Sequence, residues 1–183
     1  GSNYAVAFVD NTNGTITGIT LTISGVTATN RVYDGTTIAP LNTASAAMVG
    51  VVPGDNVVLN SAGATGSFAN KNVGPAKPVT VTGFTITGTD IGNYTLVQPT
   101  GLTANVAGRP ITVSAVTNTK VYDSTTASAN IPAITAGSIA AGDFANFTQT
   151  YDTPNVGTSK ILTPTGSVND GNGGGNYLVT FAN

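Results

Sequence analysis

The sequence predicts an all-β protein made of tandem immunoglobulin-like β-sandwich domains. Short segments rich in β-branched residues alternate apolar and polar positions, as strands with one buried face do. Turn-forming sequences separate them at intervals of about 8 to 12 residues, which suits a small sandwich. The motif Val-Tyr-Asp-x-Thr-Thr occurs twice, which indicates tandem repeats. The alternative is a β-grasp-like repeat with one short helical turn, for which Ala44–Val49 and Ser138–Phe144 are the candidates.

Two offsets define the repeats. Tyr33 and Tyr122 of the motif lie 89 positions apart, whereas the later landmarks Asn93-Tyr94 and Asn176-Tyr177 lie 83 positions apart. The second copy has therefore lost six residues, which we place in a surface loop around 59–65 because loops absorb length changes. The alignment predicts repeat 1 over residues 19–107. Repeat 2 covers residues 108–183 and lacks its final strand.

The front of the chain resembles the end of repeat 1. Asn3-Tyr4 aligns with Asn93-Tyr94, and Gly18 aligns with Gly108. Residues 1–18 are therefore predicted to be the tail strand of a preceding repeat, with strand pattern at Tyr4–Phe8. We expect this segment to complete the first folded unit or to pair with a neighbouring molecule, because an unpaired strand leaves its backbone hydrogen-bonding groups free.

The remaining elements follow in chain order. Strands are expected at Ile16–Ile23, Val57–Leu59, Val79–Thr82, Phe84–Ile86, Tyr94–Val97, Ile111–Val113 and Tyr177–Phe181. Turns are expected where Gly, Pro and Asn cluster, at Asn13-Gly14, Pro53–Asn56, Gly74-Pro75, Gly108–Pro110 and Asn169–Gly175. The junction Ala107–Pro110 is too short for a flexible linker, so we expect closely coupled repeats.

The repeated motif has a structural interpretation. Asp34 is expected to accept backbone hydrogen bonds two or three residues on, as in an Asx turn, with Gly35 easing the turn. Tyr33 is expected to bury its ring and donate its hydroxyl to a backbone acceptor. Ligand or metal binding at Asp34 and Asp123 is the alternative. The predicted structural motif residues are Tyr33, Asp34, Gly35, Tyr122, Asp123, Asn93, Tyr94, Asn176 and Tyr177.

Composition argues against several function classes. Charged residues form 8% of the chain, the net charge is −2 and no basic cluster exists, so nucleic acid is not an expected partner. No apolar run approaches the roughly 20 residues of a spanning helix, so no membrane insertion is expected. His, Cys and Glu are all missing. We therefore expect no enzyme, no catalytic residue and no cofactor.

Two further chemistries have candidate residues. Lys77 and Lys160 occupy equivalent places, so a Lys-to-Asn isopeptide crosslink is conceivable with Asp34 or Asp55 as the proton shuttle. A solvated or strand-edge lysine is the favoured alternative. Calcium is considered at Asn169–Asn176, which offers one carboxylate and several amide oxygens. Calcium usually draws more carboxylate charge, which favours a glycine turn there.

Several motifs in fixed order resemble the YDG domain, found in tandem in large bacterial surface proteins. They are Val32–Thr37, Gly50–Asp55, Phe68–Gly74, Lys77 and Gly92–Leu96, and the likeness covers both repeats and the front copy. The second copy departs with Ser124 for Gly35 and Pro154 for Lys71. Many such proteins look like filamentous haemagglutinin-type adhesins.

The resemblance implies extracellular display on a bacterial, Gram-negative cell surface, in adhesion or biofilm attachment, without an active site. We expect structural stalk or spacer repeats that project the binding region of an adhesin. The alternative is a repeat that itself binds a glycan or a host or matrix protein weakly and multivalently. The expected partners are neighbouring repeats of the same chain, and a glycan or host surface through the parent protein.

Overall fold

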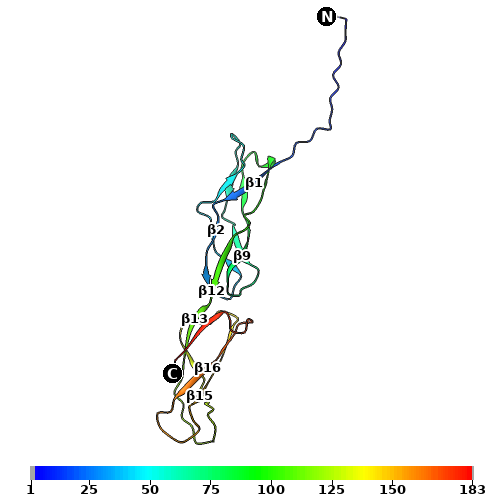
Figure 1. Cartoon of the computed structure of the whole chain (residues 1–183). Helices are drawn as coiled ribbons and strands as arrows, with labels where there is room; N and C mark the ends of the chain where they lie inside the picture. Colours follow the sequence, from blue (N-terminus) through cyan, green and yellow to red (C-terminus); the bar gives the residue numbers. More distant parts are fainter. Residues whose placement is uncertain (1–2, 183) are drawn as a thin grey trace.

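The computed structural model describes residues 3–182 of the chain (Figure 1). Residues 1, 2 and 183, which the predicted boundaries 1–18 and 108–183 include, lie outside the described residues. The predicted all-β class is confirmed, because the only helical element among residues 3–182 is one 3₁₀ turn, η1 (Ile91–Asn93). The strands form an elongated body from which the front of the chain projects.

The strand bounds follow the chain. They are β1 (Ile19–Ser24), β2 (Thr27–Ala28), β3 (Arg31–Val32), β4 (Ile38–Ala39), β5 (Leu41–Asn42), β6 (Ala47–Val49), β7 (Val58–Asn60), β8 (Thr65–Phe68), β9 (Gly74–Thr82), β10 (Thr85–Thr87), β11 (Tyr94–Leu96), β12 (Thr103–Ala107), β13 (Arg109–Ser114), β14 (Ala133–Ala136), β15 (Phe144–Tyr151), β16 (Leu162–Asn169) and β17 (Tyr177–Ala182).

Strand pairing divides these elements into two groups. Strands β1 to β12 pair only with one another, in a five-stranded sheet of order β3-β12-β9-β8-β4 and in smaller sheets β11-β1-β6, β10-β7 and β2-β5. Strands β13 to β17 form the sheets β14-β13-β17 and β15-β16. Each group starts with a strand that pairs in parallel with a tyrosine-led strand, β1 with β11 and β13 with β17. The two repeats therefore share their first pairing.

The length difference between the repeats lies in one hairpin. In repeat 2, β15 and β16 pair without interruption from Phe144↔Asn169 to Tyr151↔Leu162. In repeat 1 the corresponding strand is divided into β7 and β8 by a turn at 61–64, and these pair separately with β10 and β9. The extra residues of repeat 1 are thus accommodated at a break in a strand, within the region where we placed the loss.

Several local expectations are wrong. Tyr4–Phe8 forms no strand and is exposed, because no other segment among residues 3–182 offers it a pairing edge. Gly74-Pro75 begins β9 instead of forming a turn, and Arg109-Pro110 belongs to β13. The candidate helical turns are not helical: Ala47–Val49 pairs with β1, and Asp143 closes a tight turn on Ala140.

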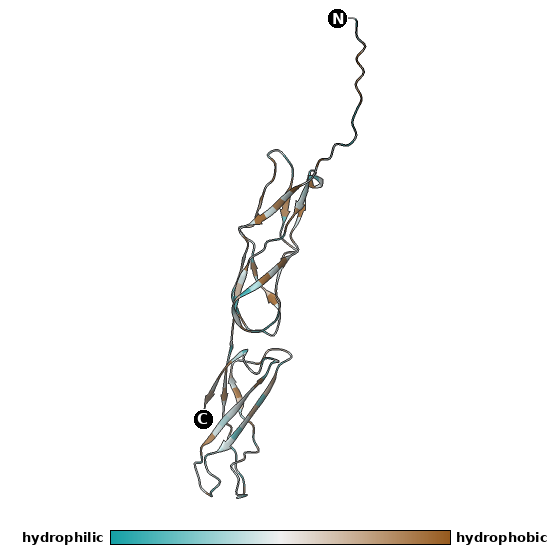
Figure 2. Cartoon of the chain, turned by 45° about the vertical axis from the view of Figure 1, so that its right-hand side comes forward, coloured by the Kyte–Doolittle hydropathy of each residue, from teal (hydrophilic) through white to brown (hydrophobic). Residues whose placement is uncertain are grey.

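Buried apolar side chains form one cluster that runs through both repeats. It includes Tyr33, Phe68 and Val106 from repeat 1 and Val113, Phe147 and Tyr177 from repeat 2. Strand segments carry most of the hydrophobic colour, as alternation requires (Figure 2). Gly108 is the only residue between β12 and β13, so the backbone passes from one repeat to the next almost without a linker.

Candidate functional site

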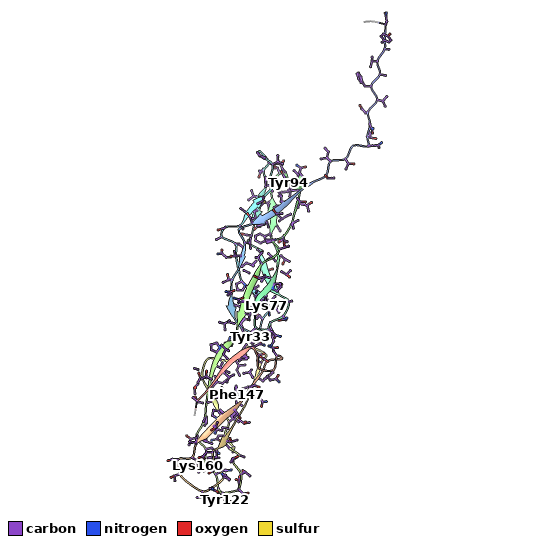
Figure 3. The ribbon with its side chains drawn as sticks, viewed as in Figure 1. Tyr33, Lys77, Tyr94, Tyr122, Phe147 and Lys160 are labelled. Carbon is purple, nitrogen blue, oxygen red and sulfur yellow. The ribbon has the colours of Figure 1, made fainter. Side chains whose placement is uncertain are left out.

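The most elaborate cluster of polar side chains lies where repeat 1 meets repeat 2 (Figure 3). Its centre is Asp143, which precedes β15 and has a side chain only 1% exposed. One carboxylate oxygen accepts hydrogen bonds from the Tyr33 hydroxyl at 2.9 Å and the Tyr177 hydroxyl at 2.7 Å. The other accepts one from the Lys71 ammonium at 2.9 Å. A buried charge needs such partners, and two of these three come from the other repeat.

Local structure positions each partner. Tyr33 follows β3 and extends its pairing, because its backbone N–H donates to the Ala107 carbonyl at 2.9 Å. Tyr177 is the first residue of β17, and its hydroxyl also accepts the backbone N–H of Ala140 at 2.9 Å. The two tyrosine rings meet edge to face, with centroids 5.5 Å apart. The rings contribute packing and the hydroxyls satisfy the acid between them.

These contacts shift the pKa values in the directions expected of a neutral-tyrosine, ionised-aspartate cluster. Burial would raise the pKa of Asp143, but hydrogen bonds from Tyr177, Lys71 and Tyr33 outweigh it and hold the pKa below its ordinary value. Burial, aided by the nearby Asp143 carboxylate, raises the pKa of Tyr177 to about 12. The Tyr33 hydroxyl and the Asp143 carboxylate raise the pKa of Lys71.

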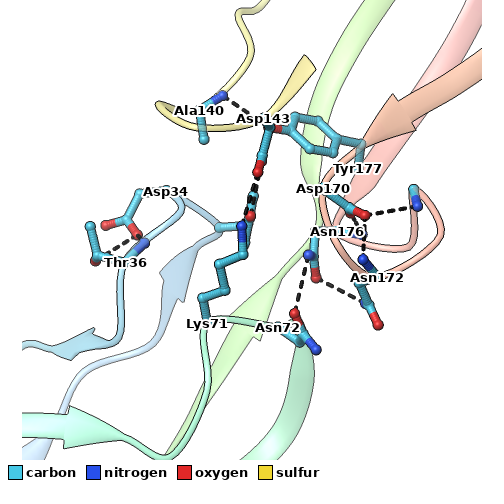
Figure 4. Close-up of polar contacts among 12 residues, drawn as sticks. Asp34, Thr36, Lys71, Asn72, Ala140, Asp143, Asp170, Asn172, Asn176 and Tyr177 are labelled. Carbon is cyan, nitrogen blue, oxygen red and sulfur yellow. Dashed lines mark hydrogen bonds and ion pairs between the residues drawn. The ribbon is translucent and has the colours of Figure 1, made fainter. Parts of the chain in front are cut away.

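A second set of bonds crosses the junction beside the first (Figure 4). The fully buried Asn176 amide accepts the Val73 backbone N–H at 3.0 Å and donates to the Asn72 side chain at 3.3 Å. The Arg109 guanidinium donates to the Tyr33 carbonyl at 3.2 Å. Repeat 2 thus forms hydrogen bonds with the backbone and side chains of repeat 1 at several points. These bonds fix the relative orientation of the two repeats.

The segment considered for calcium supports this junction. Asp170 is buried, and its carboxylate accepts the backbone N–H groups of Asn172, Gly174 and Asn176 at 2.7 to 2.9 Å. These bonds close the glycine-rich loop and hold Asn176 against Asn72. No group of three or more acidic, His or Cys side chains suited to a metal occurs within residues 3–182.

The Asp of the motif forms a local turn. Asp34 accepts the Thr36 backbone N–H and hydroxyl, both at 2.8 Å, and pairs with Arg31. Gly35 has φ +84°, where glycine is favoured, and a Cβ there would stand 3.2 Å from the Ala141 carbonyl oxygen of repeat 2. The turn therefore brings the motif's glycine against the next repeat.

The motif of repeat 2 forms the same turn at an exposed position. Asp123 accepts the Thr125 backbone N–H at 2.9 Å and pairs with Lys120. Ser124 takes the left-handed φ of +61° in place of glycine. Tyr122 is 61% exposed, whereas Tyr33 is 0% exposed. The Tyr33 ring is buried as expected, but its hydroxyl donates to the Asp143 carboxylate where we expected a backbone acceptor.

At the front end of repeat 1, Asp55 and Tyr94 form the same arrangement that Asp143 and Tyr177 form at the junction. Tyr94 donates to Asp55 at 2.6 Å and accepts the Val52 N–H at 3.0 Å, as Tyr177 does with Asp143 and Ala140. Asn93 precedes Tyr94 as Asn176 precedes Tyr177. Each repeat thus has the motif tyrosine at one end and, at the other, an aspartate bonded to a second tyrosine, which we call the Asp-Tyr acceptor. Within the chain, the motif tyrosine Tyr33 of repeat 1 contacts the Asp-Tyr acceptor of repeat 2, Asp143 and Tyr177.

The crosslink candidates lie in different repeats, Lys77 in β9 of repeat 1 and Lys160 just before β16 of repeat 2 (Figure 3). The Lys77 ammonium donates to the Asn70 amide oxygen at 2.8 Å and lies over the Phe68 ring. No ion pair among residues 3–182 joins Lys77 to a carboxylate, and neither Asp34 nor Asp55 bonds to it. Lys160 pairs with Asp152 at 3.1 Å. Neither lysine therefore has an asparagine and a carboxylic acid arranged around it.

The YDG domain family matches residues 15–101 and 107–183. The chain belongs to the YDG domain family. No curated protein and no solved structure matches it. Within residues 3–182, no helix has both the length and the apolar character needed to cross a membrane.

Sequence reasoning missed the central acid of the YDG junction. Gly54-Asp55 and Gly142-Asp143 occupy matching places in the two YDG domains, but we considered Asp55 only as a motif residue and as a candidate proton shuttle. The signal was present, because an aspartate kept at the same place in both copies needs a partner in both. What the sequence does not display is that Asp143 meets the YDG tyrosine 110 positions away.

Proposed function

We propose that the chain forms structural stalk or spacer repeats of a bacterial cell-surface adhesin, filamentous haemagglutinin-like in kind. The observation that carries this proposal is the buried junction at Asp143, where one residue links the repeats and Lys71 and both tyrosines meet one carboxylate. Such a junction resists bending. Tandem domains joined this way act as a semi-rigid rod and project what lies at its end.

The two-ended design of each repeat supports the same proposal. The inserted tyrosine and the Asp-Tyr acceptor lie at opposite ends of repeat 1, at Tyr33 and Tyr94 (Figure 3). A unit with complementary ends extends in one direction, as stacked repeats do. The extracellular, Gram-negative cell surface and a role in adhesion or biofilm attachment belong to this proposal. Its partners are neighbouring repeats, and a glycan or host surface reached through the parent protein.

A repeat that itself binds a glycan or a host or matrix protein is less well supported. Such a repeat would present exposed aromatic side chains at equivalent positions in both copies. Tyr122 is exposed and its counterpart Tyr33 is buried. The matched polar groups are committed to turns and to the junction.

A display experiment separates the two functions. The 183-residue chain is placed between an outer-membrane anchor and a sugar-binding tip of known ligand, in none, one or two copies, on cells with a thick polysaccharide coat. We expect adhesion to beads carrying that ligand to rise with copy number, and fusions without the tip not to adhere. Equal adhesion by the tipless fusion to glycan- or matrix-coated beads would overturn the spacer function.

A further inference from the structure

A groove of about 700 Å³ lies at the end of repeat 2 remote from the junction. One wall is the segment 115–120 and the other is the segment 151–162. Its rim includes Tyr122, and Val156 is 86% exposed there. The Asn118 side-chain nitrogen is buried in the wall without a hydrogen-bond partner among residues 3–182. Exposed apolar groups beside an unsatisfied donor indicate a surface that another chain segment covers.

The corresponding groove of repeat 1 is filled by β12. Its last residues, Val106 and Ala107, pair in parallel with β3, and the strand pairs antiparallel with β9 from Thr103↔Pro78 to Val106↔Gly74. The inward side chains Ala104 and Val106 are both buried. By the repeat offsets, β3 and the start of β9 correspond to 120–121 and 157–161 of repeat 2. No strand among the described residues lies between those segments.

The same chain carries a second copy of the β12 pattern at its front. Ninety positions before β12, residues 13–17 read Asn-Gly-Thr-Ile-Thr, which places Gly14 opposite Ala104 and Ile16 opposite Val106. A small residue and a β-branched residue thus occupy the two inward positions. This segment pairs with no strand within residues 3–182 and projects from the body, and Ile16 is fully exposed (Figure 1).

The connection after this segment has the length that the junction requires. Gly108 alone separates β12 from β13, and Gly18 alone separates Thr17 from β1. Residues 13–17 of a second copy, seated in the groove, would therefore deliver that copy's β1 to the place that β13 holds at the internal junction. Tyr122 of the first copy would then meet Asp55 of the second copy, the counterpart of Asp143.

We propose that this groove is a strand-acceptor site for residues 13–17 of a second copy of the chain. The segment enters as β12 does, parallel to 120–121 and antiparallel to 157–161, and adds backbone hydrogen bonds and the buried Ile16 side chain. The placement accounts for three exposed features of the described residues together: the groove, the strand-like segment 13–17 and Tyr122.

The geometry makes this assembly head to tail. Donor segment and groove lie at opposite ends of the elongated chain, so a molecule cannot fill its own groove. Such an interface is heterologous and builds open linear oligomers.

Two cations of the internal junction have no counterpart in this interface, since Pro154 replaces Lys71 and Ile19 replaces Arg109. Association is therefore weaker than the internal contact. Residues 3–12 of the second copy stay outside the groove. They correspond to the β11 region of repeat 1, and β17 already occupies that place in repeat 2.

Sedimentation velocity over a concentration series tests the site. We expect the 183-residue chain to form linear oligomers and Ile16→Asp to lower the association constant by roughly tenfold or more, because a charge would enter an apolar position. Val6→Asp, in the same exposed segment, is the matched control and leaves association unchanged. Neither side chain packs in the body, so neither variant threatens folding. A strict monomer, or equal association by both variants, overturns the proposal.

Cysteine trapping tests the register, since the chain has no cysteine of its own. In repeat 1, Ala107 pairs with Val32, and the corresponding positions are Thr17 and Val121. The double variant Thr17→Cys, Val121→Cys is expected to give a ladder of disulfide-linked multimers on mild oxidation. Val6→Cys, Val121→Cys is expected to give far less. Equal ladders from the two pairs would contradict insertion of residues 13–17.

Discussion

The two YDG motifs of this chain have the same turn but different surroundings. Asp34 and Asp123 both bind the backbone two residues on, at 2.8 and 2.9 Å. Yet Tyr33 is buried between Asp143 and Tyr177, whereas Tyr122 is exposed. The aspartate's role is therefore a local property of the motif. The tyrosine's role belongs to the pair of repeats, because its partners come from the next one.

Truncating the two tyrosines gives the largest difference between the repeats. Tyr33→Ala is expected to lower the free energy of unfolding by about 3 to 5 kcal/mol, because it removes a buried ring and the hydrogen bond to Asp143. Tyr122→Ala, the matched control, is expected to stay within about 0.5 kcal/mol. Urea denaturation followed by circular dichroism measures both. Equal effects would contradict the assigned difference.

The two acceptor aspartates should differ next. Asp143→Asn removes the charge that Lys71 and two tyrosines share, and we expect a loss of about 2 kcal/mol. Asp55 holds one such tyrosine, Tyr94, so Asp55→Asn is expected to cost about 1 kcal/mol. The same denaturation series gives both values. A larger loss at Asp55 would show that the junction does not depend on the shared carboxylate.

The pH profile of stability reports the same cluster. The pKa of Asp143 lies below its ordinary 3.8 in the folded chain, so its contribution is present above pH 3.8 and is lost as pH falls through the folded value. Tyr177 has its pKa raised to about 12, so its contribution holds below pH 10 and is lost as pH rises toward 12. Melting temperatures across pH should show both losses.

Asp143→Asn should make the acid loss shallower, and Asp10→Asn, in the exposed front segment, is the control. If Asp143→Asn left the loss of stability at acid pH unchanged, other carboxylates would account for all of that loss.

The fourth motif position, Gly35 in one copy and Ser124 in the other, gives small effects of opposite sign. Gly35→Ser is expected to cost about 1 to 2 kcal/mol, because its φ is left-handed and a Cβ would approach the Ala141 carbonyl. Ser124→Gly is expected to gain about 0.5 to 1 kcal/mol, since it relieves the left-handed conformation of an exposed serine. Calorimetric melting distinguishes the two signs. A stabilising Gly35→Ser would contradict close packing at the junction.

Local chemistry made part of this structure predictable. Alternation located strands such as β11 and β17, and the Asx turn at Asp34 follows from a short acceptor side chain next to its own backbone. We predicted a turn at Gly74-Pro75 because proline and glycine suit turns in general. In the structure these residues begin β9, in the part of the strand that pairs with β12 and not with β8. The Tyr4–Phe8 strand failed for another reason: strand pattern without a partner forms no strand.

The site required information that no local pattern contains. Tyr33 and Asp143 meet only because β12 and β13 are joined by Gly108, which places the end of one repeat on the start of the next. Recurrence of the aspartate in both repeats was a usable signal that a junction exists. Its partner could not be chosen among several tyrosines without the fold.

A double-mutant cycle on Tyr33 and Asp143 tests the central claim that the motif tyrosine docks on the next repeat. Tyr33→Phe, Asp143→Asn and the double variant are compared by urea denaturation, with Tyr122→Phe and Asp143→Asn as the control cycle. We predict a coupling of about 1 kcal/mol or more for the first cycle and additivity for the control. Additivity within about 0.3 kcal/mol in the first cycle would contradict the account.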